Sequence, residues 1–70
     1  MARDVFSAPF IVEWEDDGQD EGEQRFAALG MVDNRLVFVA YTMRAGAIRI
    51  ISARPAEPFE RRKYYDENQT

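Results

Sequence analysis

The stretch Ala47-Ile-Arg-Ile-Ile-Ser-Ala-Arg54 follows a second apolar run, Leu36-Val-Phe-Val-Ala-Tyr-Thr-Met43, after a turn of only a few residues. Both runs are rich in β-branched and aromatic residues, which favour extended strands. Ala45-Gly46 lies between them and can form a tight turn. We therefore predict that the two runs form the central hairpin of a small antiparallel sheet.

Two more strands and one helix are predicted around this hairpin. Residues Arg25–Val32 form the preceding strand, which ends at Asp33-Asn34, a pair that tolerates the left-handed conformations of a tight turn. Residues Pro9–Glu15 form an earlier strand at the sheet edge, where a proline is best tolerated. Pro55 stops the fourth strand, and Pro58–Glu67 is a helix with Pro58 in its first turn. The expected fold is a single α+β domain, residues 1–70, with a four-stranded meander and a C-terminal helix.

Length and composition limit the possible chemistry. Seventy residues suffice for one domain with a small core. The chain has no cysteine and no histidine, which excludes disulfides, thiol nucleophiles, imidazole catalysis and the usual zinc sites. No apolar run approaches the length of a membrane span, and no signal peptide is present, so we expect a cytoplasmic protein without membrane contact. We expect no metal and no cofactor.

Charge is unevenly distributed along the chain. The net charge is −4, but residues 1–35 hold nine acids and three bases, whereas residues 36–70 hold four acids and six bases. Much of the acidity lies in residues 15–23, a predicted surface loop without apolar residues. A calcium loop does not fit, because the twelfth position is Ala28 or Gln24, depending on the glycine chosen, where a glutamate is needed. A solvated loop is favoured over a weak cation site or a charge-mimicking role.

The arginines of the strands fall into a row if both hairpin turns have two residues. Val32 then faces Arg35 and Arg44 faces Ala47, so Arg25, Thr42 and Arg49 lie side by side across three strands. Period-two alternation adds Leu29, Phe38, Ala40, Ile51 and Ala53 to this face, and it puts Phe26, Val39, Tyr41, Met43, Ile48, Ile50 and Arg54 on the other. The row is either ordinary strand-end charge paired with the acidic loop or an anion clamp of the kind that guanidinium groups make with phosphate.

Other basic and aromatic residues also allow two interpretations. Arg61-Arg62-Lys63 is a solvated helix face or, interleaved with Phe59, Tyr64 and Tyr65, a nucleic-acid contact. Trp14 is more typical of a core residue than of a stacking platform, because an indole is a large apolar body.

Four segments carry a resemblance to a known family: Gly22-Glu-Gln-Arg-Phe-Ala-Ala-Leu-Gly30, Val39-Ala-Tyr-Thr-Met-Arg44, Ile48-Arg-Ile-Ile-Ser-Ala-Arg54 and Glu60-Arg-Arg-Lys-Tyr-Tyr65. In order and spacing they resemble the C-terminal two-thirds of the BrnT family of bacterial toxins. The resemblance implies a RelE-like fold and a type II toxin, a ribonuclease that blocks growth and is neutralised by BrnA, an antitoxin with a ribbon-helix-helix part. The N-terminal strand and helix usual in the family are not recognisable, so the chain looks N-terminally shortened.

The resemblance also implies site residues and a mechanism. The catalytic residues expected from it are Arg25, Arg49, Arg54, Glu60 and Tyr64, and the RNA-binding residues are Arg44, Arg61, Arg62 and Lys63. The enzyme would be a metal-independent endoribonuclease acting through the ribose 2′-hydroxyl, with arginines stabilising phosphate charge and Tyr64, Lys63 or Glu60 handling protons. The alternative function is a catalytically inactive binding module that associates with an antitoxin or with itself.

Both sheet faces are expected to be substantially apolar, and the sequence offers only one convincing helix to cover them. Ala2–Ser7 is too short for an independent helix and resembles the last turn of a longer element. We therefore expect one face to lack a cover and the chain to form a two-fold homodimer.

Overall fold

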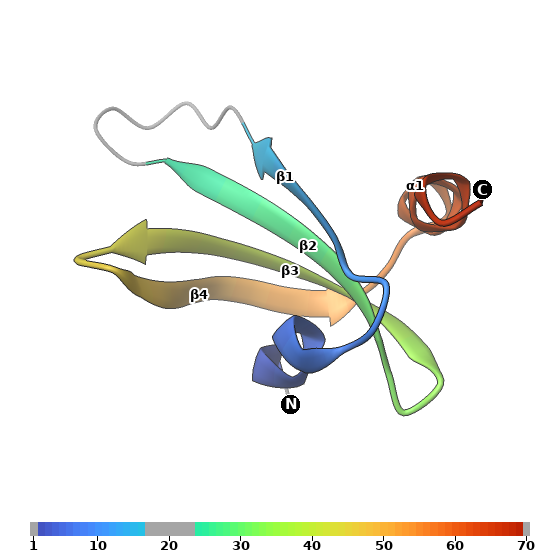
Figure 1. The fold of residues 1–70 in the computed structure, drawn as a ribbon, viewed down its shortest axis with the longest axis horizontal. Coiled ribbons are helices and arrows are strands. Elements are labelled where there is room, and N and C mark those ends of the chain that lie inside the picture. The colour runs from blue at the N-terminus through green and yellow to red at the C-terminus, as the bar shows by residue number, and fades with distance from the viewer. Residues whose placement is uncertain (1, 17–23, 70) are drawn as a thin grey trace.

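The computed structural model describes residues 2–16 and 24–69. Along the chain its elements are η1 (Ala2–Ser7), β1 (Val12–Asp16), β2 (Arg25–Val32), β3 (Arg35–Arg44), β4 (Ala47–Pro55) and α1 (Pro58–Glu67). The four strands form one antiparallel sheet in the order β1-β2-β3-β4 (Figure 1). The predicted α+β fold, a four-stranded meander with a C-terminal helix, is confirmed.

The first strand differs most from its prediction. β1 begins at Val12 rather than Pro9, because the chain turns sharply at Phe10, whose φ is 62° and whose side chain is 73% exposed. A positive φ is incompatible with a strand. Most of the predicted acidic loop, residues 17–23, lies outside the described residues.

Both hairpin turns have two residues, as the register prediction required. Asp33 and Asn34 have φ values of 51° and 65°, and Ala45 and Gly46 have values of 53° and 80°. Left-handed residues at both central positions match the right-handed twist of the flanking strands. Ala45 is the one side chain of the four that has no particular tolerance for this conformation.

One face of the sheet is covered by α1. Its buried core consists of Leu29, Leu36 and Tyr64, with Trp14 and Phe38 among the partly buried residues packed against it. At the end of α1, the Asn68 side-chain amide donates hydrogen bonds to the carbonyls of Phe10 (3.2 Å) and Tyr64 (2.9 Å). The helix is thereby held beside the turn that precedes β1.

The opposite face is covered in part by η1, so the prediction that this face lacks a cover is wrong. Val5 is fully buried there with Ala28, Val39 and Tyr41. The Phe6 ring packs edge-on against Tyr41 at a centroid distance of 5.0 Å. Six residues form a stable short helix in this position because tertiary packing replaces the length they lack. The homodimer inferred from an open face loses that basis and stays a prediction.

Gly30 explains how η1 comes so close to the sheet. A Cβ atom at this position would lie 2.9 Å from Val5 Cγ1 and 3.0 Å from the Val5 carbonyl oxygen. No residue other than glycine leaves room for that contact.

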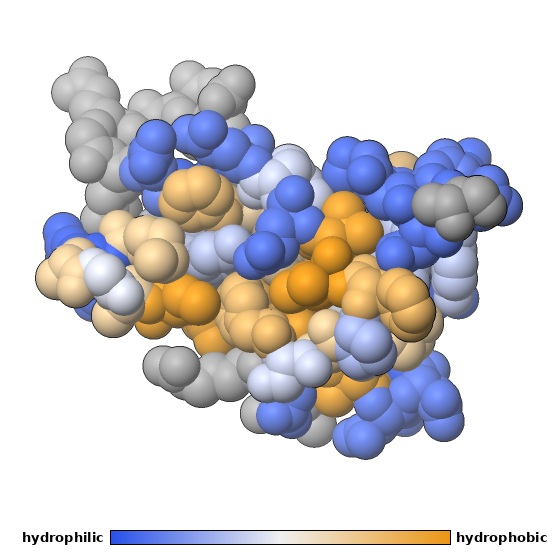
Figure 2. Space-filling model, viewed as in Figure 1, coloured by the Kyte–Doolittle hydropathy of each residue, from blue (hydrophilic) through white to orange (hydrophobic). Residues whose placement is uncertain are grey.

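Figure 2 shows apolar side chains gathered across the middle of the molecule in this view, with hydrophilic side chains towards its margins.

Candidate functional site

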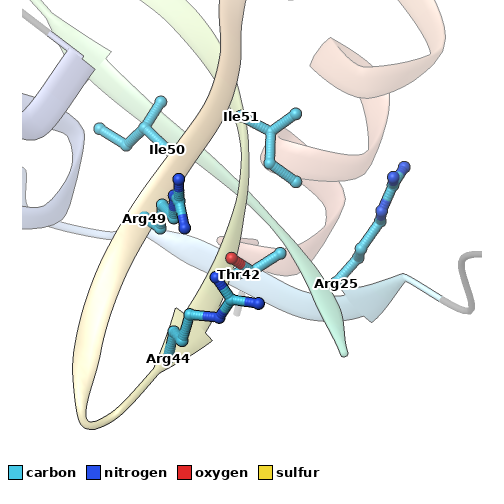
Figure 3. A pocket seen from close by; sticks show the side chains of 6 residues that line it. All are labelled: Arg25, Thr42, Arg44, Arg49, Ile50 and Ile51. Atoms are coloured by element: carbon cyan, nitrogen blue, oxygen red, sulfur yellow. The ribbon is translucent and has the colours of Figure 1, made fainter. Parts of the chain in front are cut away.

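The predicted arginine row is present at the open end of the α1 face. Arg25 pairs with Thr42, and Thr42 pairs with Arg49, across β2, β3 and β4. These residues line a shallow groove of about 380 Å³, together with Arg44, Ile50 and Ile51. Figure 3 shows the Arg44 and Arg49 side chains close to Thr42, whereas the Arg25 side chain extends away from them. Three arginines and a threonine therefore line one open groove.

Arg44, which the resemblance gave as an RNA-binding residue, belongs with this row. It lies two residues after Thr42 on β3, so the period-two alternation used for the other residues puts it on the same face. The alternation was the signal that could have found it. Ile50 also borders the groove, while it packs against the core of the opposite face, where it was predicted.

A β-bulge in β4 changes the predicted place of Arg54. The register runs from Tyr41–Ile50 to Ala40–Ser52, which leaves Ile51 as an extra residue. A bulge of one residue reverses the facing of everything beyond it. Arg54 therefore pairs with Phe38 and shares the face of Arg25 and Arg49, whereas Ala53 moves to the η1 face. Both assignments from strict alternation were wrong.

On the α1 face Arg54 meets the buried Glu60. Its Nη1 and Nη2 atoms donate to the two carboxylate oxygens at 2.8 and 2.7 Å, and the guanidinium lies 4.3 Å from the centre of the Phe38 ring. The Glu57 backbone amide donates to the same carboxylate at 2.8 Å. Glu60, which is 2% exposed, therefore caps the first turn of α1 and forms a bidentate ion pair with Arg54.

The charge state of this pair is fixed. Burial opposes ionisation of Glu60, but hydrogen bonds from Arg54 and from the Glu57 amide, with the charge of Arg54, outweigh it, so the pKa of Glu60 lies below its ordinary value. The hydrogen bond to Glu60 raises the pKa of Arg54 despite some loss of hydration. Glu60 is thus an ionised hydrogen-bond acceptor at neutral pH.

The remaining predicted residues lie on or beneath α1. Tyr64 is buried in the core of this face, with its ring 5.4 Å from that of Tyr65. Lys63 extends over the Trp14 ring, with Nζ 4.8 Å from its centre, and Trp14 packs against the core as predicted. Arg61 and Arg62 are exposed. The predicted catalytic residues therefore divide into Arg25 and Arg49 in the groove, and Arg54, Glu60 and Tyr64 at the α1 contact.

Two further observations concern the residues that the structure describes. Within residues 2–16 and 24–69, no group of three or more His, Cys, Asp and Glu side chains is placed to hold a metal ion. The helical segments in these ranges fall short of the length and apolar character of a membrane-spanning helix.

The chain is a small α+β domain, and three arginines line the groove on its antiparallel sheet. Comparison with known families identifies it further. The profile of the family described as "Ribonuclease toxin, BrnT, of type II toxin-antitoxin system" matches residues 1–60. The chain belongs to this family of toxins, which implies an antitoxin as its partner. No curated protein and no solved structure matches the chain.

Proposed function

We propose that this protein is a metal-independent endoribonuclease of the bacterial cytoplasm that inhibits growth by cutting RNA and is neutralised by a BrnA-like ribbon-helix-helix antitoxin. The observation that carries the proposal is the groove that Arg25, Arg44 and Arg49 line together with Thr42. One guanidinium group can donate two parallel hydrogen bonds to the oxygens of a phosphate, so this arrangement suits one phosphodiester of an RNA chain.

Cleavage would use the ribose next to the bound phosphate. The 2′-oxygen attacks phosphorus as its proton leaves, the bond to the 5′-oxygen breaks, and that oxygen takes up a proton. The products are a 2′,3′-cyclic phosphate and a 5′-hydroxyl. Negative charge builds on the phosphate oxygens during attack, and Arg25 and Arg49, already positioned, stabilise it.

Arg54, Glu60 and Tyr64 would contribute by positioning rather than by contact with RNA. The Arg54–Glu60 pair joins the end of β4 to the start of α1, and Tyr64 anchors the helix in the core. Lys63, half-buried over Trp14 and outside the groove lining, would have to reach the groove to act as the proton donor, and the exposed Arg61 and Arg62 would hold RNA outside the groove. This division follows burial: an exposed arginine reaches a polyanion, whereas an enclosed carboxylate does not.

The test is RNA cleavage by purified protein in EDTA, with end-group analysis. Arg49→Ala should lower the rate by about 10²–10³ if one charge-stabilising donor is lost. Arg35→Ala is the matched control, because Arg35 is an exposed arginine at the far end of the sheet. Equal activity of Arg49→Ala and the parent protein, or loss of activity on chelation, would refute the mechanism.

The binding-module alternative is favoured by one observation. Among the described residues the groove lining includes no carboxylate, tyrosine or lysine, so it holds charge without an obvious proton carrier. Induced expression separates the two functions. Growth arrest relieved by Arg49→Ala supports the ribonuclease, whereas harmless expression together with tight antitoxin binding supports the module.

A further inference from the structure

β4 is an edge strand, and none of its nine residues is buried. The two central strands differ: β2 contains a run of four buried residues, and β3 contains the buried Leu36, Val39, Tyr41 and Thr42. Yet β4 is among the most β-branched segments of the chain, and its Ile51 is 47% exposed. Long, apolar, exposed edges are unusual in natural sheets because they recruit other strands.

The register shows which backbone groups of β4 face outward. After a two-residue turn, the Arg44–Ala47 and Thr42–Arg49 pairs are hydrogen-bonded to each other, so the amides of Ile48 and Ile50 point away from β3. Beyond the bulge, Ser52 and Arg54 face β3, and Ala53 faces outward. The hydrogen bond from the Ala56 amide to the Leu36 carbonyl, 3.0 Å, continues the same alternation. Outward amides thus follow at Ile48, Ile50 and Ala53, before Pro55.

The charges near the two edge strands favour different kinds of incoming strand. Residues 34–56 contain four arginines and no acid. Three of these arginines lie in the β3–β4 hairpin on the groove face, and one of the three, Arg54, is already paired with Glu60. The other edge strand, β1, has three acids among its five residues, which is a common way of protecting an edge. An incoming strand with acidic side chains is therefore attracted to β4 and repelled from β1.

We propose that the β4 edge accepts an extended acidic segment of the partner protein as a fifth strand of the sheet. The identity of that partner as an antitoxin rests on the proposed function, but the docking does not require catalysis. Alternate side chains of the added strand would lie on the two faces. Acidic ones would meet Arg49, and apolar ones would extend the η1 face beside Ile48 and Ile50. The added strand would thereby close the groove against RNA.

The probe is the peptide acetyl-Val-Glu-Val-Glu-Val-Glu-Val-amide, with its lysine counterpart as the charge control. We expect the acidic peptide to bind in calorimetry and to slow amide hydrogen exchange at Ile48, Ile50 and Ala53, and we expect the lysine peptide not to bind. Ala53→Pro removes one outward amide without removing a bond to β3 and should weaken binding at least tenfold. The control is Ala53→Val, because valine also adds side-chain volume but retains the backbone amide; this variant should bind the acidic peptide like the parent.

A second variant guards against misfolding of Ala53→Pro. Arg49→Glu leaves the backbone unchanged and should reverse the preference from the acidic to the lysine peptide. Binding of neither peptide, equal binding by Ala53→Pro and Ala53→Val, or protection of β4 amides by self-association alone would overturn the proposal. RNA cleavage is measured separately, so an active enzyme that ignores the peptide refutes only the docking, and an inactive protein that binds it refutes only the ribonuclease.

Discussion

Replacing Glu60 with glutamine should destabilise the fold more than any other change of one charged group. Glu60 accepts three hydrogen bonds, two from Arg54 and one from the Glu57 amide, while only 3% of its side chain is exposed. Removing one partner of a buried pair costs about 3–5 kcal/mol. The Arg54 side chain is 39% exposed and would be partly hydrated once its partner is gone. We therefore expect the free energy of unfolding of Glu60→Gln to fall by about 2–3 kcal/mol.

The assay is urea unfolding followed by the fluorescence of Trp14, the only tryptophan, which packs against the same core as α1. With a slope of about 1 kcal/mol/M for a small domain, the midpoint should fall by about 2–3 M at unchanged slope. Glu57→Gln is the matched control, because Glu57 is an exposed glutamate at the same helix end; it should lose less than about 1 kcal/mol.

The pH dependence gives an independent check. Because the pKa of Glu60 is lower in the folded than in the unfolded state, its contribution is present above the ordinary glutamate value of about 4.3 and is lost as pH falls through the folded value. Glu60→Gln should lack that loss. A midpoint shift no larger than that of Glu57→Gln, or the same loss of stability at low pH in Glu60→Gln as in the parent, would show that the Arg54–Glu60 ion pair contributes little to stability.

Three further predictions concern the sheet. Gly30→Ala should destabilise by about 1–3 kcal/mol in urea unfolding because its Cβ would overlap Val5, whereas an unchanged midpoint would mean that η1 moves freely. Ala45→Gly should stabilise by about 0.5–1 kcal/mol by relieving a left-handed alanine, and a destabilised variant would contradict that turn geometry. Burial and the 2.8 Å hydrogen bond to Glu13 raise the pKa of Tyr41 to about 12. The free energy of unfolding should therefore fall as pH rises from about 10 to about 12, and it should fall less in Tyr41→Phe. A phenolate absorbance titration in which all three tyrosines ionise at the ordinary pH would refute this.

Helix α1 and the hairpin registers were predictable because their signals are local. Pro58 and Glu60 mark a helix start from sequence alone, and the observed helix has the predicted bounds. Asp33-Asn34 and Ala45-Gly46 fix the register of three strands by turn length, which is why the Arg25–Thr42–Arg49 row was found before the structure.

The parts that escaped prediction depend on contacts between distant segments. Nothing in Ile50-Ile51-Ser52 distinguishes a bulge from regular strand, so the facing of Arg54 could not be read from the sequence. η1 is too short to persist alone and owes its place to the fit of Val5 over Gly30. The Arg54–Glu60 pair combines both effects, since it needs the bulge to turn the arginine and the helix to present the carboxylate.

The extra residue at Ile51 makes chain length, rather than residue identity, the quantity that this part of the protein must keep. A substitution at Ile51 changes one half-exposed side chain, but its deletion would return β4 to regular alternation and send Arg54 through the sheet to the η1 side. Glu60 would then be left enclosed with no guanidinium to meet it. Related chains should therefore vary in composition between Thr42 and Glu60 far more readily than in the number of residues between them.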